Sequence, residues 1–342
     1  MNSILNVAMI GVGRIGRIHA GNIANRIPGL RLAAIADVNL DGAREVAGQF
    51  NVPRAVGDYR ELLRDPSIEA VIICSGTDSH LPIIEEAAAA NKHIFCEKPI
   101  GLDLPGIRRA LDVVKKAGVK LQVGFNRRFD PSFAKVREAI AAGKIGTPQI
   151  VRITSRDPSP PPLEYIRISG GLPLDMTIHD FDMVRFLTGQ EVEEVSAFGS
   201  ALIDPEIGRA GDVDTCLISM RLSGGAFATI DNSRQAVYGY DQRVEVFGSG
   251  GMVAAGNCPT DVHVLSNRDG IHSAKPIHFF LERYQDAYLV EMQEFAACIR
   301  EDRPPSVSGI DGLQPVVTAL AVIKALREHR FVRVSEIADF GE

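Results

Sequence analysis

Short, uniformly apolar runs alternate with helix-patterned segments through about residue 125. Runs of this kind lack the polar alternation of a half-exposed strand and are typical of parallel strands buried on both faces. The runs are Val7–Ile10, Leu32–Ala36, Ala70–Cys74, Ile94–Cys96 and Leu121–Val123. The helical segments are Ile15–Arg26, Asp41–Phe50, Leu81–Ala90 and Pro105–Lys116. This alternation predicts a doubly wound parallel sheet, a Rossmann-type α/β domain over residues 1–125.

The pattern changes after Arg128, where the apolar runs become longer and alternate with polar residues. Such runs are typical of an antiparallel sheet with one covered face, and Ser223-Gly224-Gly225 supplies a hairpin turn. The runs are Gln149–Ser155, Val192–Ala201, Val213–Leu222, Ala226–Asn232 and Gln242–Phe247. Helical periodicity returns at Tyr284–Arg300 and Leu313–Arg327. We therefore predict a second domain over residues 126–310, of α+β class, with an open, mainly antiparallel sheet.

Composition narrows the classes of protein. A chain of 342 residues exceeds one ordinary core, which agrees with two domains. A net charge of −6 with scattered basic residues argues against a nucleic-acid partner. The five cysteines form no CxxC pair, so we expect reduced thiols, no disulfides and no metal site. We see neither a signal peptide nor an apolar stretch approaching the roughly 20 residues of a membrane span. We expect a cytoplasmic protein.

A glycine-rich turn follows the first strand and opens a helix. Gly11 permits a tight turn, Gly13 lets the backbone approach a pyrophosphate, and Gly16 allows close packing of helix on sheet. The amides at the helix start, at Arg14 and Ile15, face the anion. This context predicts a dinucleotide site.

Asp37 ends the second strand, about 20 residues after Gly16. A carboxylate there accepts hydrogen bonds from the adenosine ribose hydroxyls and repels a 2′-phosphate, which favours NAD over NADP. The alternative is a plain turn or helix-capping residue. The next strand ends in a loop whose Ser75, Thr77 and His80 are also predicted to contact the cofactor, although small hydroxylated residues equally suit a helix cap.

Glu97-Lys98-Pro99 ends another predicted parallel strand. A lysine in the crevice above a sheet can donate to a substrate hydroxyl and stabilise a developing alkoxide. Lys98 is therefore a candidate catalytic residue. We also predict that Glu97 and Lys98 contact the cofactor. The alternative is a solvated lysine at a strand end.

Asp175 and His179 lie four residues apart, so on one helix they would share a face. The segment Thr177–Leu187 has helical periodicity and places His179 near a helix start. A neutral imidazole can take a hydroxyl proton as hydride leaves the carbon, and Asp175 could orient it. A structural histidine is the alternative. We interpret Asp180 and Asp182 as surface or capping groups.

Together, the Gly11–Gly16 turn, Glu97-Lys98-Pro99 and the Asp175–His179 pair resemble the Gfo/Idh/MocA family of sugar and polyol dehydrogenases. The resemblance covers nearly the whole chain and, around Gly124–Pro131 and Tyr238–Gln242, points to inositol-oxidising members of rhizobial type. It implies NAD-dependent oxidation of myo-inositol to its 2-keto product, scyllo-inosose, with Lys98, Asp175 and His179 catalytic. One departure is Cys74-Ser-Gly-Thr, which replaces the commoner Thr-Pro-Thr kind of loop.

The same resemblance implies that Arg127, Asp157 and Tyr240 contact the ring hydroxyls, although Arg127 and Asp157 could instead pair with each other. It also implies a homotetramer joined through the open sheet, with helix 313–327 packed back on the nucleotide domain. Alternative functions are a dehydrogenase of scyllo-inositol or of an aldose such as glucose, and a non-enzymatic dinucleotide sensor. A sensor need not retain Lys98, Asp175 and His179 together.

Overall fold

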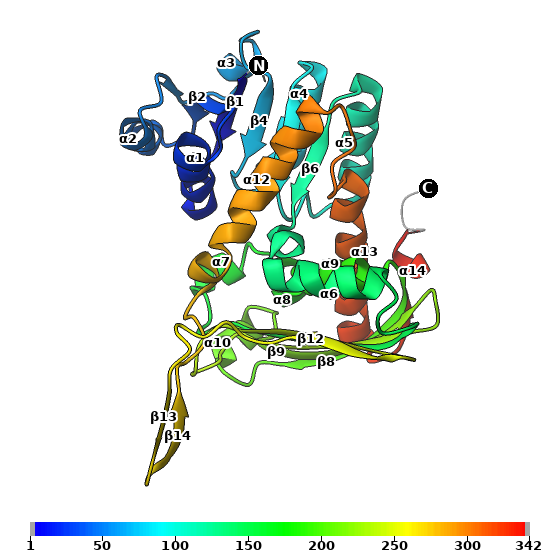
Figure 1. The fold of residues 1–342 in the computed structure, drawn as a ribbon. Coiled ribbons are helices and arrows are strands. Elements are labelled where there is room, and N and C mark those ends of the chain that lie inside the picture. Colours follow the sequence, from blue (N-terminus) through cyan, green and yellow to red (C-terminus); the bar gives the residue numbers. More distant parts are fainter. Residues whose placement is uncertain (1–3, 339–342) are drawn as a thin grey trace. The chain divides into compact units, whose positions relative to one another are not determined.

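The computed structural model describes residues 4–338 and divides into two compact units (Figure 1). Unit 1 contains the chain up to Phe129 together with Asp286–Val316. Unit 2 contains Asp130–Gln285 and the chain from Val317 onward.

Unit 1 is built on a six-stranded parallel sheet in the order β3-β2-β1-β4-β5-β6. The strands are β1 (Leu5–Ile10), β2 (Leu30–Ala36), β3 (Ala55–Val56), β4 (Ala70–Ile73), β5 (His93–Glu97) and β6 (Leu121–Gly124). The helices are α1 (Arg14–Arg26), α2 (Leu40–Phe50), α3 (Arg60–Leu63), α4 (Thr77–Ala89), α5 (Leu104–Ala117), the 3-10 helix η1 (Asn126–Phe129) and α12 (Gln285–Arg300). The strand order reverses between β1 and β4, which is where sheets of this kind bind ligands.

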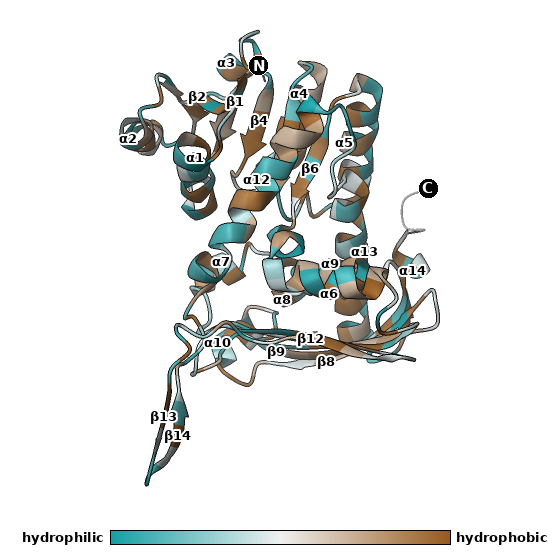
Figure 2. Ribbon diagram, viewed as in Figure 1, coloured by the Kyte–Doolittle hydropathy of each residue, from teal (hydrophilic) through white to brown (hydrophobic). Residues whose placement is uncertain are grey.

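The sheet of unit 1 is buried on both faces, and its strands are largely apolar (Figure 2). Helix α12 is distant in sequence, yet Met292 and Phe295 belong to the same core as Val7 and Phe95. We expected one boundary, at residues 125–126. Unit 1 instead ends at Phe129 and also includes Asp286–Val316, because the apolar side of α12 completes the Rossmann core.

Helix α13 (Gly309–Glu328) begins in unit 1 and continues in unit 2. Its first turn packs closely on unit 1, since a Cβ at Gly309 would lie 2.2 Å from Leu111 and one at Gly312 would lie 2.9 Å from Val123. It is also the one helix among residues 4–338 that is long and apolar enough to cross a membrane, which the sequence reading overlooked. Since 56% of its apolar window is buried, it is explained as a core helix.

Unit 2 contains a seven-stranded mixed sheet in the order β12-β11-β7-β10-β9-β8-β15. The pair β7–β10 is parallel and the other neighbouring pairs are antiparallel. The strands are β7 (Pro148–Arg156), β8 (Val192–Ser200), β9 (Thr215–Leu222), β10 (Phe227–Ser233), β11 (Asp241–Gly248), β12 (Gly251–Ala255) and β15 (Val332–Arg333). The shorter helices are α6 (Pro131–Ala141), α7 (Leu163–Ile166), α8 (Leu172–Asp175), α9 (Ile178–Thr188), α10 (Pro205–Arg209), α11 (Phe280–Arg283) and α14 (Ser335–Ala338).

Helices α6 and α9 cover one face of this sheet, through contacts of α6 with β12 and of α9 with β7 (Figure 1). Residues of β9 and β10 alternate between buried and outward-facing, as expected for a sheet with one covered face. A separate hairpin of β13 (Val264–Asn267) and β14 (Gly270–Ser273) extends away from the sheet.

Candidate active site

The glycine-rich turn has one position left open and two that only glycine fits. Gly11 has φ of +94°, and a Cβ there would lie 2.5 Å from the Ser75 amide nitrogen. A Cβ at Gly16 would lie 2.2 Å from the Gly11 carbonyl oxygen, so Gly16 lets α1 pack on the turn. A Cβ at Gly13, by contrast, would meet nothing within 4 Å. Open space therefore lies over the turn where the fingerprint brings a pyrophosphate closest to the backbone.

The start of α1 suits an anion. Its N-cap is Gly13, which has no side chain to accept from the amides, and its first turn contains no acidic residue. The helix dipole places partial positive charge at this end. The residues present therefore fit the pyrophosphate of NAD.

Asp37 lies directly beyond β2 and is anchored by main-chain amides. Its Oδ2 accepts from Val12 N at 2.8 Å and its Oδ1 accepts from Asn39 N at 2.8 Å. The N-cap of α2 is Asn39, whose side chain accepts from Gly42 N, so capping is not the role of Asp37. The carboxylate is held against the glycine-rich turn, and its contact with ribose stays a prediction.

His80 is buried beneath the loop that carries Ser75 and Thr77. Its Nδ1 lies 2.8 Å from the Pro99 carbonyl oxygen and its Nε2 lies 3.1 Å from the Ser75 carbonyl oxygen. Burial lowers the pKa of His80, so the neutral ring donates from one nitrogen at a time. His80 thus links the loop after β4 to the turn that follows Lys98. Cofactor contact by Ser75, Thr77 and His80 stays a prediction.

Glu97 and Lys98 lie at the carboxyl end of β5, next to β4 in the sheet. Glu97 is buried and Lys98 is half-buried, and the Lys98–Pro99 peptide is cis. His19 Nε2 of α1 lies 2.8 Å from Glu97 Oε1. Sequence spacing gave no indication of this pair, since its members are 78 positions apart.

Asp175 and His179 do not share one continuous helix, and this part of our interpretation was wrong. Asp175 is the last residue of α8, and His179 is the second residue of α9. The Leu172 carbonyl accepts from both Met176 N and Thr177 N at 3.0 Å, which ends the first helix before the second begins. His179 does lie near a helix start, as we predicted.

Asp175 meets a tyrosine and a buried arginine that sequence reasoning missed. Tyr165 Oη donates to Asp175 Oδ1 at 2.7 Å, and Arg234 Nη1 donates to Asp175 Oδ2 at 3.1 Å. The Arg234 side chain is 1% exposed, and its Nη2 lies 3.5 Å from Asp212 Oδ2. A lone arginine just past a predicted strand carries no motif, so only the folded chain reveals this contact.

Asp180 and Asp182 are buried, so their interpretation as surface groups was wrong. Asp180 Oδ2 accepts from Asn232 Nδ2 at 2.9 Å, and Asn232 Oδ1 accepts from Thr177 Oγ1 at 2.6 Å. This network ties the start of α9 to β10. A buried charge needs such donors, which local sequence does not display.

The three residues expected to contact ring hydroxyls lie on separate elements. Arg127 is buried on η1 of unit 1. Asp157 follows β7, where its amide donates to the Ser233 carbonyl at 2.9 Å. Tyr240 is buried, and its ring lies edge-on to Tyr284 at 6.0 Å between centroids. Their role in binding stays a prediction.

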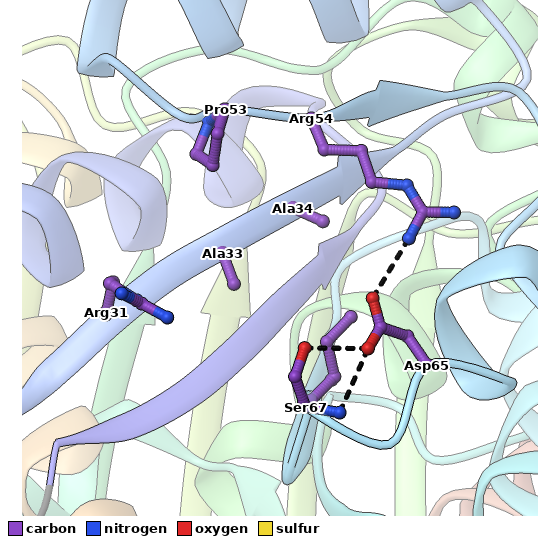
Figure 3. A pocket seen from close by; sticks show the side chains of 8 residues that line it. Arg31, Ala33, Ala34, Pro53, Arg54, Asp65 and Ser67 are labelled. Carbon is purple, nitrogen blue, oxygen red and sulfur yellow. Dashed lines mark hydrogen bonds and ion pairs between the residues drawn. The ribbon is translucent and has the colours of Figure 1, made fainter.

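A pocket of about 300 Å³ opens beside β2, lined by Arg31, Ala33, Ala34, Pro53, Arg54, Asp65, Ser67 and Ile68 (Figure 3). Across it, Arg54 pairs with Asp65 at 3.1 Å, and Asp65 accepts from the Ser67 hydroxyl at 2.6 Å. The pocket borders the strand before its carboxyl end, where Asp37 follows. It is therefore distinct from the candidate cofactor site.

Comparisons with known proteins agree with these features. An oxidoreductase family model with an NAD-binding Rossmann fold matches residues 5–125, and a GFO/IDH/MocA C-terminal domain matches residues 133–254. The chain is 49% identical to a myo-inositol 2-dehydrogenase of Thermotoga maritima, over 97% of this chain and 99% of that one. It is 45% identical to an inositol 2-dehydrogenase of Rhizobium meliloti, over 96% and 98% of the two chains.

A solved structure supports the same conclusion. It is a scyllo-inositol dehydrogenase from Lactobacillus casei with bound NAD(H) and scyllo-inositol, at a TM-score of 0.91 and 33% identity over 97% of this chain and 100% of that chain. The predicted fold class, a Rossmann domain followed by an α+β domain with an open sheet, is confirmed. The chain belongs to the Gfo/Idh/MocA family of oxidoreductases, and its N-terminal part is an NAD-binding Rossmann domain.

Proposed function

We propose that this protein oxidises myo-inositol to 2-keto-myo-inositol (scyllo-inosose) with NAD. The observation that carries the proposal is the similarity, over nearly the full length of both chains, to relatives named inositol 2-dehydrogenases. The sequence motifs that contain Lys98, Asp175 and His179 supply an ammonium, a carboxylate and an imidazole, the groups that this chemistry needs.

The reaction needs one hydride acceptor and one proton acceptor, and NAD, when bound, would be the hydride acceptor. The hydroxyl proton passes to His179 as general base, while the C–H bond releases its hydride and the carbon becomes a ketone. The Lys98 ammonium donates to the substrate oxygen and stabilises the charge that develops there. The products are inosose, NADH and one proton, so the reaction balances.

Asp175 has the setting of an orienting group. Tyr165 donates to one of its carboxylate oxygens and Arg234 to the other, so contacts from two different elements fix the carboxylate. A carboxylate fixed in this way can distinguish hydroxyl positions on a ring, because the wrong epimer would leave buried polar groups unpaired.

The remaining contacts follow the same proposal. The cofactor is held by Asp37, Glu97 and Lys98, by the turn from Gly11 to Gly16, and by the loop with Ser75, Thr77 and His80. The inositol ring meets Lys98, Asp175 and His179 together with Arg127, Asp157 and Tyr240. Residues 1–125 serve as the NAD-binding domain, and residues 126–310 bind substrate and join subunits.

The runner-up substrate is scyllo-inositol, because a similar solved structure holds that ring. An aldose such as glucose and a non-catalytic dinucleotide sensor are the further alternatives. Absorbance of NADH with NAD and a panel of myo-inositol, scyllo-inositol and glucose separates them. Highest kcat/KM with myo-inositol supports the proposal, highest kcat/KM with another ring reassigns the substrate, and NAD binding without turnover on any of them supports the sensor.

The outer face of the unit 2 sheet supports a homotetramer. Phe198 is 80% exposed, and Leu217 and Phe227 face outward from neighbouring strands. An apolar sheet face of this kind fits a second copy of the chain. Phe198→Asp together with Leu217→Asp should convert a tetramer to smaller species in light scattering, and an unchanged mass would contradict this. The five free cysteines support a reducing, cytoplasmic location.

A further inference from the structure

Three ionisable side chains from three elements meet inside unit 1. His19 comes from α1, Glu97 from the end of β5, and Glu291 from α12. His19 Nε2 lies 2.8 Å from Glu97 Oε1 and 3.7 Å from Glu291 Oε1. The side chains of His19 and Glu291 are 0% exposed, and that of Glu97 is 12% exposed. Of these three side chains, only that of Glu97 is exposed to solvent.

Glu291 lacks the partners that a buried carboxylate requires. Among the residues that the structure describes, no hydrogen-bond partner lies within reach of either of its carboxyl oxygens. The neighbouring His19 ring is flanked edge-on by Phe95 and Tyr288, at 5.1 and 5.6 Å between centroids. Since an unpaired buried carboxylate costs several kcal/mol, burial without a partner favours the neutral acid of Glu291 over its carboxylate. Burial, and then the charge of Glu97, raise the pKa of Glu291 well above its ordinary value.

The groups facing Glu291 agree with a held proton. They are His19 and Glu97, with the thiols of Cys74 and Cys96 close by; burial, followed by the charge of Glu97, raises the pKa of both thiols. If both glutamates were ionised beside a neutral histidine, two negative charges would share a closed space. One proton on Glu291 leaves a single charge on Glu97, which sits at the rim and accepts the His19 N–H.

The Glu97 side chain is also held in place by close packing. A Cβ at Gly124 would lie 3.0 Å from its carboxyl carbon, so the carboxylate packs directly on β6. On the other side of the group, Gln122 Nε2 donates to the Glu291 main-chain carbonyl at 2.8 Å and fixes α12 to the same strand. The residue that follows Glu97 is Lys98, so whatever fixes Glu97 also fixes the main chain that carries Lys98.

We propose that His19, Glu97 and Glu291 form a buried proton-holding site that positions Lys98 for the reaction. Glu291 keeps one proton at neutral pH, His19 donates to Glu97, and Glu97 holds the end of β5. The positioning role rests on the proposed function, whereas the proton on Glu291 does not.

The held proton is tested without any enzyme assay. Between the ordinary glutamate pKa and the raised one, the folded chain binds one proton more than the unfolded chain, so stability falls as pH rises. Folding constants are measured by urea unfolding from about pH 5 to about pH 9. For each pH unit, the folding constant of the parent should fall by an additional factor of about ten relative to that of Glu291→Gln. Infrared spectra of the parent should contain a protonated carboxyl band that shifts in heavy water and is absent from Glu291→Gln.

Glu294→Gln is the matched control on the same helix. Glu294 pairs with Arg303 at 2.7 Å, and this partner lowers the pKa of Glu294. The control should lose stability at neutral pH, approach the parent in acid, and keep the infrared band. Parallel pH curves for the parent and Glu291→Gln, with no band, would overturn the proposal. So would a stoichiometric metal that survives dialysis and is lost in Glu291→Gln, because the three ligand atoms lie within 4.8 Å of one another and could hold a cation instead.

The positioning role is tested by comparing His19→Gln with His19→Leu. Glutamine keeps an N–H donor for Glu97 and leucine does not, so His19→Leu should lose about tenfold or more in kcat and His19→Gln should recover most of it. The loss in kcat should exceed any change in KM for inositol, because Lys98 is displaced rather than removed. Equal kcat in both variants and the parent would refute positioning. If Lys98→Ala is itself active, the proposed function fails, while the infrared and unfolding results still decide the proton site.

Discussion

Replacing Arg234 by methionine should disable the reaction through Asp175. The guanidinium is 1% exposed and lies 3.1 Å from Asp175 and 3.5 Å from Asp212, whose side chains are 14% and 9% exposed. Methionine keeps much of the apolar stem and removes the charge. Two nearly buried carboxylates would then face each other without their shared cation.

The magnitude follows from these contacts. Removing one partner of a buried ion pair costs about 3–5 kcal/mol in stability, because the remaining charge stays buried and unpaired. Asp212 Oδ1 still accepts from Leu172 N at 2.9 Å, which offsets part of that loss. Asp175 loses the charged donor on its Oδ2 and with it one of the contacts that orient it. We expect kcat to fall about 10²-fold, equivalent to about 2.7 kcal/mol of transition-state stabilisation.

The assay measures kcat and KM for inositol, NAD affinity by calorimetry, and the thermal midpoint. Arg234→Lys restores a charge that reaches one carboxylate, so its kcat should lie between those of the parent and Arg234→Met. Arg152→Met is the control, since Arg152 is 66% exposed and pairs with Glu245 at 3.3 Å in the same unit; it should keep kcat. The reasoning is refuted if Arg234→Met remains folded and turns over at the parent rate.

Three further outcomes are expected. Asp37→Ala should narrow the preference for NAD over NADP by raising the KM for NAD, because the carboxylate that repels a 2′-phosphate is gone; equal kcat/KM with both cofactors in the parent would contradict the assignment. Lys98→Ala should lose at least ~10²-fold in kcat with little change in thermal midpoint, and the reverse result would make Lys98 a structural residue. In the parent, kcat/KM for inositol should rise with pH as an imidazole loses its proton, and inosose reduction should fall. His179→Gln should abolish that dependence while NAD still binds, and an acid limb that persists at parental height would identify another base.

The Rossmann sheet could be predicted because its signals are local. A strand buried on both faces is recognised by its lack of polar alternation. The tight turn after β1 needs φ of +94° at Gly11, and a glycine at that position in the sequence is enough to predict the turn. The outer part of unit 2 had weaker signals. The strand β12 and the hairpin β13–β14 are short and largely exposed, so no apolar periodicity distinguishes them from a loop.

The helix break between Asp175 and His179 was invisible for a related reason. Residues around Thr177 have a continuous helical pattern, and what ends α8 is a main-chain carbonyl, that of Leu172, accepting two amides. Thr177 then joins Asn232, 55 positions away, in the buried network that also holds Asp180. Propensity cannot anticipate a break whose stabilisation comes from another strand.

Carboxyl groups mark the limit of sequence reasoning most clearly. The sequence singles out Asp175 through its spacing to His179, whereas Glu291 lies within the helical pattern of Tyr284–Arg300 and nothing in that pattern predicts a site. In the folded chain Arg234, which follows β10, brings a guanidinium to Asp175, whereas α12 places Glu291 next to His19 and a second glutamate, Glu97. The first is held by a cation and the second holds its own proton. The charge of each acid is therefore decided by the groups that the fold places opposite it.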